Sequence, residues 1–275
     1  MSVSVADPQQ AIAALAEWKA DQGRVWGAAS WQDIAEGTLY PVHDQLVARL
    51  APQPGERWLD LATGTGAVAL RAARAGAEVT GLDLAPGLIE TAKRLAAAQG
   101  LPVRFDVGDV ESLPYADASF NVVSSAHGVV FAVDHAAVAA ELARVCRPGG
   151  RLGLTYWLPN PELQRLMERV GYTRPEGAGR PSDWARREYA AGLLGAHFEL
   201  DFAEALCPWT GESGEALWQL FLRADGPAKA GVAALPDDER EALRRDWVEY
   251  FERHRTEAGI SAPRPYLIIH GRRVD

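Results

Sequence analysis

Short apolar runs alternate with helical stretches along the chain, and this alternation constrains the fold more than any other feature. The runs of about five residues predict strands, and the stretches of about ten residues between them predict helices. Such strand–helix–strand units predict an α/β fold with a parallel sheet, and right-handed crossovers place helices on both of its faces. Strands are expected at Arg57–Leu61, Glu78–Leu82, Val103–Val107, Phe120–Ser124 and Arg151–Trp157, and helices at Ala67–Ala75, Pro86–Gln99 and His135–Val145.

The regions before and after this alternation are predicted to be mainly helical. Asp7 and Asn160 each precede a proline and are expected as N-caps, as is Asp134 before the helix at His135. Helices are expected from Pro8 to about Asp21, at Pro41–Leu50, at Pro161–Val170, from near Ser182, at Gly214–Ala224 and at Pro236–Arg255. Two further segments, His197–Ala205 and Pro265–Gly271, are expected as strands.

Length and charge limit the classes of function. A chain of 275 residues suits one α/β domain with insertions, or such a domain with a small cap. The net charge is −9 and the arginines form isolated pairs rather than a basic tract, so no nucleic-acid partner is expected. An acidic protein is better suited to a neutral or cationic small substrate.

The sequence also predicts the cellular compartment. No apolar run reaches about eighteen residues, the length of a membrane span, and the first residues do not form a signal-peptide pattern. The two cysteines, Cys146 and Cys207, stand apart and indicate neither a metal cluster nor a disulfide framework. We therefore expect a cytoplasmic protein that binds neither a membrane nor a metal.

The segment Leu59–Gly66, with the sequence LDLATGTG, carries the most chemical information. It follows an expected strand and precedes an expected helix. Gly64 and Gly66 allow a tight turn that brings the backbone close to a ligand. The next expected strand ends immediately before Asp83, whose carboxylate can accept two hydrogen bonds from a ribose diol.

Two enzyme classes share this pattern. Gly64, Gly66 and Ala69, with an acidic residue about twenty positions further on, also fit the dinucleotide fingerprint of nicotinamide-dependent oxidoreductases. Three features favour a different cofactor. Asp60 lies within the strand, where a dinucleotide site usually has an apolar residue, and can face a cationic amino-acid group. Asp109 follows the third strand, where it can accept from an adenine amino group, and no lysine follows a tyrosine at Tyr-x-x-x-Lys spacing.

Four segments, in this order, resemble class I S-adenosylmethionine-dependent methyltransferases of the ubiquinone/menaquinone-biosynthesis type, a methyltransferase-domain-11-like group. The resemblance implies a Rossmann-like sheet of seven strands, with 197–205 and 265–271 as the last two and the final strand antiparallel. It implies S-adenosylmethionine as the cofactor and methyl transfer to an oxygen, nitrogen or carbon atom of a small-molecule acceptor. The segments are LDLATGTG (59–66), GLDLAPGLIETAKR (81–94), GDVESLPYADASFNVV (108–123) and RVCRPGGRLGL (144–154).

The resemblance also assigns contacts to the cofactor, position by position. The residues that it implies are Asp60, Ala62, Gly64 and Gly66 along the methionine part, Asp83 at the ribose hydroxyls, Leu84, Leu88, Asp109 and Val110 around adenine, and Ser125, Ala126 and His127 beside the sulfonium.

Transfer from a sulfonium requires alignment more than activation, because the sulfonium is already a strong electrophile. Well-oriented reactants gain on the order of 7–11 kcal/mol. His127 is the candidate catalytic base, because an imidazole titrates near neutral pH. The alternative is a histidine that only packs near the cofactor. For the whole chain, the alternatives are a nicotinamide-dependent oxidoreductase and a cofactor-binding protein without transferase activity.

The sequence predicts four regions: a helical N-terminal cap segment (1–50), the Rossmann-like core (51–205), a helical insertion (206–263) and the final core strand (264–275). An insertion of that length is not expected to be structureless, so its helices should form an α-helical cap over the acceptor site together with residues 18–40. The alternative for 206–263 is a dimer surface. Five tryptophans outside the expected sheet either line an apolar acceptor pocket or pack cap helices: Trp26, Trp31, Trp184, Trp209 and Trp218.

Overall fold

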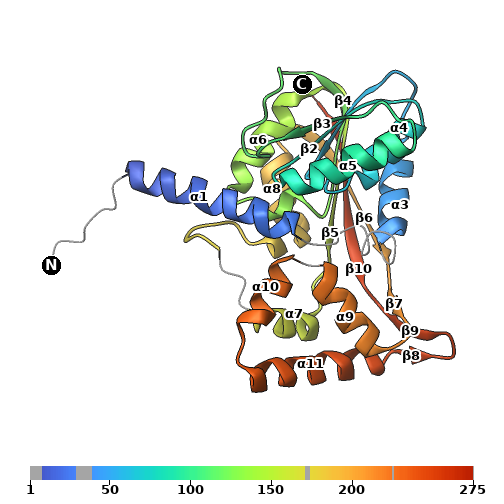
Figure 1. Cartoon of the computed structure of the whole chain (residues 1–275). Coiled ribbons are helices and arrows are strands. Elements are labelled where there is room, and N and C mark those ends of the chain that lie inside the picture. The colour runs from blue at the N-terminus through green and yellow to red at the C-terminus, as the bar shows by residue number, and fades with distance from the viewer. Residues whose placement is uncertain (1–7, 29–38, 171–173, 225, 275) are drawn as a thin grey trace.

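The computed structural model describes residues 8–28, 39–170, 174–224 and 226–274. Its centre is a seven-stranded sheet in the order β3-β2-β1-β4-β5-β10-β6 (Figure 1). The first five strands in this order are parallel, and β10 is antiparallel to both of its neighbours. The strands are β1 (Arg57–Leu61), β2 (Glu78–Asp83), β3 (Arg104–Val107), β4 (Phe120–Ala126), β5 (Cys146–Trp157), β6 (Phe198–Leu206) and β10 (Pro265–Arg273). The seven-stranded α/β fold with an antiparallel last strand is thereby confirmed.

Two layers of helices cover the two faces of this sheet. One hydrophobic cluster joins the sheet to α3 (Tyr40–Leu50), α4 (Ala67–Arg74) and α5 (Pro86–Ala98), and Trp58 of β1 is fully buried in it. A second cluster joins the opposite face to α6 (His135–Val145) and α8 (Arg187–Leu194). Each helix buries the stripe of aliphatic residues that its 3.6-residue period aligns, which explains why both faces are covered.

Local signals set several element boundaries as expected. The carboxylate of Asp134 accepts hydrogen bonds from the first turn of α6, and Asn160 caps α7 (Pro161–Glu168) in the same way. Other boundaries differ from the expectation. Helix α1 (Pro8–Gly27) runs six residues beyond Asp21, and α8 is preceded by a 3₁₀ turn, η3 (Pro181–Ala185). A further 3₁₀ turn, η2 (Val129–Phe131), follows β4.

The segment between β6 and β10 forms a second, smaller body with its own hydrophobic cluster. Its three helices, α9 (Gly214–Ala224), α10 (Gly226–Ala234) and α11 (Asp237–Glu252), pack with α7 from the core region. A small antiparallel sheet in the order β7-β9-β8 completes it, made of Trp209–Gly211, Gly259–Ala262 and Arg255–Thr256. The expectation of two helices there was incomplete, because α10 and this sheet are additional.

Figure 1 shows this second body beyond the carboxyl end of the parallel strands, with α1 between it and the helices around the sheet. Helix α1 contacts both α5 and α10. Among the described residues, no helix combines the length and apolar character that crossing a membrane requires.

Candidate cofactor and acceptor site

The parallel strands bring the sequence-predicted site residues to one edge of the sheet. In the strand register Asp60 of β1 lies opposite Gly81 of β2 on one side and Ser124 of β4 on the other. Asp83 pairs with Val107 of β3. Because these positions are all at or near the carboxyl ends of their strands, the loops that follow them meet at the place where open α/β sheets bind ligands.

The turn after β1 has the conformation that its glycines allow. Gly64 and Gly66 have φ values of 57° and 86°, in the left-handed region. Ala62 also has a positive φ, 48°, although it carries a side chain. Among the described residues, a Cβ at Gly64 would meet no heavy atom within 4 Å, so that part of the structure leaves the outer side of this turn open to a ligand. A non-glycine residue held in the left-handed region at such a turn is typical of a functional site.

Asp60 is the buried acid beneath this turn. Its side chain accepts hydrogen bonds from the hydroxyls of Thr63 and Ser124, at 2.5 and 2.7 Å. The indole N–H of Trp58 donates in turn to the Ser124 hydroxyl at 2.8 Å. Burial outweighs these hydrogen bonds and raises the pKa of Asp60 to about 6. A cationic group placed beside Asp60 would reverse that effect, because an opposite charge favours the carboxylate.

Asp83 fixes the relative position of the two loops that follow β1 and β2. One carboxylate oxygen accepts from the backbone N–H of Gly64 at 2.8 Å, and the other accepts from that of Ala85 at 2.9 Å. Burial raises the pKa of Asp83, although backbone hydrogen bonds oppose the shift. Each carboxylate oxygen can accept a second hydrogen bond. Asp83 can therefore bind a diol while it holds the turn.

The four residues expected around adenine come from three neighbouring segments. Leu84 lies directly beneath Gly23 of α1, and Leu88 is buried on α5. Val110 packs at the margin of the main hydrophobic cluster. Asp109, after β3, forms an ion pair with a lysine of α1, which the sequence reasoning did not associate with this site.

The loop after β4 contains the three residues expected beside the sulfonium. The hydroxyl of Ser125 accepts from the backbone N–H of Val129, and Ala126, the last residue of β4, is partly buried. His127 has a φ of 58° and is enclosed by rings: it stacks on Trp157 with centroids 4.0 Å apart, and Tyr266 lies edge-on at 6.2 Å. Among the described residues, neither ring nitrogen of His127 has a hydrogen-bond partner.

The surroundings of His127 keep its imidazole neutral. Burial is the main cause, followed by the positive charge of Arg264 and by His43, and together they lower the pKa of His127 well below 6.5. His127 is therefore a weaker base than an ordinary histidine. Its unpartnered nitrogens can still donate or accept a hydrogen bond.

Arg264 is a second residue that the sequence reasoning missed. Its guanidinium lies 4.1 Å from the ring centroids of both Trp157 and Trp209, and it donates to the backbone oxygen of Cys207 at 3.0 Å. Trp157 belongs to β5 and Trp209 to the small sheet, so Arg264 connects the core to the second body. The single arginine before a strand has no sequence signal that distinguishes it from a surface residue.

The other tryptophans have different roles. Trp184 is buried in the main cluster and Trp218 in the cluster of the second body, so both pack helices. Trp26 packs on Phe131, with ring centroids 5.1 Å apart. Trp31 lies outside the described residues.

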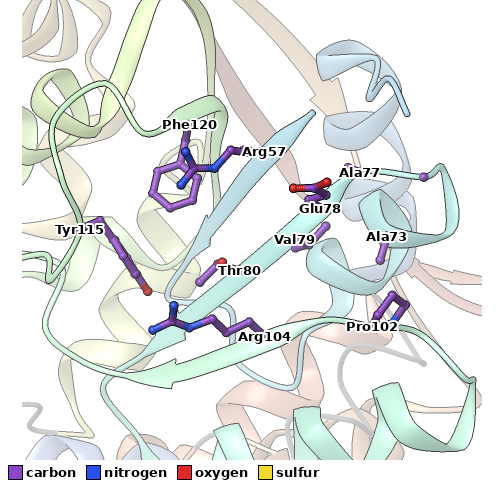
Figure 2. A pocket seen from close by; sticks show the side chains of 11 residues that line it. Arg57, Ala73, Ala77, Glu78, Val79, Thr80, Pro102, Arg104, Tyr115 and Phe120 are labelled. Carbon is purple, nitrogen blue, oxygen red and sulfur yellow. The ribbon is translucent and has the colours of Figure 1, made fainter. Parts of the chain in front are cut away.

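An open cavity of about 490 Å³ lies at the opposite, amino edge of the sheet. Figure 2 shows Arg57, Glu78 and Arg104, the first residues of β1, β2 and β3, around it. Along β2, Glu78 and Asp83 are about 16 Å apart at 3.3 Å per residue. This cavity is therefore separate from the candidate cofactor site.

The donor and acceptor groups at the carboxyl edge fit S-adenosylmethionine. In that case Asp60 would offer a buried carboxylate to the ammonium of its methionine part, Asp83 would offer acceptors to the ribose diol, and Asp109 would offer an acceptor to the adenine amine. With respect to the described residues, the space outside Gly64 is open, and the ligand would lie along the turn there.

Comparisons with known proteins agree with this geometry. A methyltransferase-domain family model matches residues 59–154. An uncharacterised protein of Mycobacterium tuberculosis is 40% identical over 174 residues, which cover 62% of this chain and 64% of that protein. Demethylmenaquinone methyltransferase of Thermus thermophilus is 44% identical over 122 residues, which cover 43% of this chain and 56% of that enzyme. The match thus spans less than two thirds of each relative.

The fold comparison extends over more of the chain. The crystal structure of the YcgJ protein from Bacillus subtilis superimposes with a TM-score of 0.59 at 20% sequence identity, covering 85% of this chain and 98% of that one. The likeness at this identity concerns the fold. Taken with the family match and the two relatives, it shows that residues 59–154 carry a methyltransferase domain within the seven-stranded α/β fold.

Proposed function

We propose that the protein transfers a methyl group from S-adenosylmethionine to a small, partly apolar acceptor molecule. The observation that carries the proposal is the glycine turn after β1 with two buried carboxylates against it, Asp60 and Asp83. Bound at this turn, the cofactor supplies an electrophilic methyl group.

The same turn argues against a dinucleotide. A pyrophosphate is held by free backbone N–H groups at a helix N-terminus. Here the N–H of Gly64 already donates to Asp83, that of Thr63 to Leu82, and that of Gly66 to Thr63. Two carboxylates beside the turn would also repel phosphate charges. The nicotinamide-dependent alternative therefore has no support in the geometry of the turn.

The acceptor site is proposed at the carboxyl end of β4, beside His127. Trp157 and Tyr266 provide aromatic walls there, and Arg264 with Trp209 lies next to them from the second body. We propose that the neutral imidazole of His127 hydrogen-bonds to the acceptor and orients its nucleophilic atom. As a base, it would take a proton only transiently, because an imidazolium would be buried near the Arg264 cation.

The second body and α1 are proposed as a cap over this site, as the sequence suggested for 206–263 and 18–40. Arg264 supports this proposal, since its guanidinium is held between a tryptophan of the core and one of the small sheet. Water exclusion by such a cap favours the alignment that methyl transfer requires. The alternative role for these helices is a dimer interface with a second copy of the chain.

A cytoplasmic location is part of the proposal. The two cysteines, Cys146 and Cys207, are both buried and neither forms a disulfide, which is consistent with a reducing compartment.

The proposed function is tested first by binding and then by transfer. Calorimetry should detect binding of S-adenosylmethionine and of S-adenosylhomocysteine to the protein, and no binding of NAD. Incubation with methyl-labelled cofactor and a mixed metabolite extract should then give a labelled small molecule, identified by mass spectrometry. Binding of NAD alone would refute the cofactor assignment. Cofactor binding without any labelled product across extracts would favour a cofactor-binding protein without transferase activity.

A further inference from the structure

Helix α1 lies across the loops that follow β2 and β4 (Figure 1). A Cβ at Gly23 would be 2.9 Å from the carbonyl oxygen of Leu84, so the backbone of α1 touches the loop after β2 directly. Three residues further along α1, Trp26 packs on Phe131 of the turn after β4. Helix α1 therefore covers part of the edge at which the cofactor binds.

Lys19 joins α1 to the loop after β3 by two ion pairs. Its Nζ lies 2.7 Å from the carboxylate of Asp109 and 2.5 Å from that of Glu111. The side chains of Lys19 and Glu111 are 17% and 10% exposed, so solvent and salt screen these pairs less than they screen surface pairs. Lys19 places one positive charge between two carboxylates that would otherwise repel each other.

Glu111 extends this cluster to the loop after β4. Its second oxygen accepts from the backbone N–H groups of Val133 and Asp134, at 2.6 and 3.1 Å. The second oxygen of Asp109 accepts from the backbone N–H of Glu111 at 2.9 Å. Both oxygens of Asp109 are therefore fixed, one by Lys19 and the other by the loop that Lys19 also holds.

We propose that Lys19 is a further residue of the cofactor site, which positions Asp109 for the adenine amino group and holds α1 against the site as its outer wall. The proposal rests on the proposed function, because the ligand is the cofactor of that reaction. The side chain of Asp109 is 30% exposed, so its carboxylate can accept one more hydrogen bond. The cofactor then leaves only when α1 separates from the loop after β3.

The test measures how fast the protein releases its cofactor. Radiolabelled S-adenosylmethionine is bound to the full chain and chased with unlabelled S-adenosylhomocysteine, and the retained label is followed by rapid filtration. Lys19→Met should accelerate release by roughly 10- to 100-fold, the range for losing a hydrogen bond to a charged group. Lys19→Arg should restore slow release. Lys93→Met is the matched control, because Lys93 pairs with Glu90 on the exposed surface of α5.

A mutant cycle separates positioning from a merely structural effect. If Lys19 acts through Asp109, then Lys19→Met should accelerate release much less when Asp109→Asn is already present. Full additivity of the two substitutions, or an unchanged release rate in Lys19→Met, would overturn the proposal for Lys19. The proposal would also be overturned if Lys19→Met accelerated cofactor release no more than the control Lys93→Met does. A wild-type protein that retains no labelled cofactor would instead refute the proposed function, and the assignment of Lys19 with it.

Discussion

The replacement Asp60→Asn should make the cofactor-free protein more stable and its cofactor binding weaker. Asp60 is 2% exposed and its pKa is raised to about 6, because burial disfavours the charged carboxylate. Between its ordinary pKa and this value, the folded protein binds more protons than the unfolded chain does. The free energy of unfolding therefore falls as the pH rises through this window, and the loss persists above pH 6.

The size of this effect follows from the pKa. A rise from 3.8 to about 6 corresponds to about 3 kcal/mol, at about 1.4 kcal/mol per pH unit. An asparagine occupies the same space without charge. Its amide can keep both hydrogen bonds, because the hydroxyls of Thr63 and Ser124 can rotate to donate or to accept.

Urea unfolding of the cofactor-free protein measures the gain. At pH 7.5, Asp60→Asn should unfold with a free energy about 3 kcal/mol larger than the wild type, and the difference should disappear near pH 4. Asp117→Asn is the control, since the side chain of Asp117 is 81% exposed. Calorimetry should show that Asp60→Asn weakens S-adenosylmethionine binding by roughly 10- to 100-fold. A variant that is no more stable than the wild type at pH 7.5 would refute the reasoning.

Three further predictions concern the site. Asp83→Ala should weaken the binding of both S-adenosylmethionine and S-adenosylhomocysteine by roughly 10- to 100-fold in calorimetry, and unchanged affinity would remove Asp83 from the site. His127→Ala should lower turnover by roughly 10²-fold with nearly intact cofactor affinity, because the acceptor loses the hydrogen bond that orients it. The wild-type pH–rate profile should show no loss of activity near pH 6.5 from this residue, because its pKa is far lower. Trp209→Ala removes the cation–π contact between Trp209 and Arg264, which is worth about 1–2 kcal/mol when desolvated, and should raise the KM for the acceptor by roughly tenfold. An unchanged KM would exclude the second body from the acceptor site.

The elements that the sequence predicted well are those whose boundaries depend on neighbouring residues. Strand β1 and helix α9 have the expected bounds, and Asp134 caps α6, because periodicity and capping act over a few positions. Helix α10 was missed because Gly226, Pro227 and Gly231 are usually read as helix breakers. Pro227 falls in the first turn, where no backbone N–H is needed, and Ala228 and Val232 bury one face in the cluster of the second body.

The candidate site also combines contacts between residues close in the sequence with contacts between distant ones. The proximity of Asp60, Gly64 and Asp83 could be predicted because a strand, a turn and a helix place them within one short segment of chain. Lys19 lies 90 residues from Asp109 in the sequence, and Arg264 lies 57 residues from Cys207. Contacts of this kind depend on how α1 and the second body pack on the sheet, and no local pattern encodes that packing.

The turns after β1 and β4 contact each other directly, in addition to the hydrogen bonds that pair the two strands. A Cβ at Gly128 would lie 2.3 Å from the Cβ of Ala62, so the two turns are in direct contact. The hydrogen bond from Ser124 to Asp60 joins the same two strands just before these turns. Ala62 and His127 both adopt a left-handed backbone, which is unfavourable for residues with side chains and persists only where surrounding contacts impose it. The residues proposed for the methionine part of the cofactor and the histidine proposed beside the acceptor thus lie on two turns in direct contact. Contact between the turns favours a fixed alignment of the two reactants, on which methyl transfer depends more than on acid or base strength.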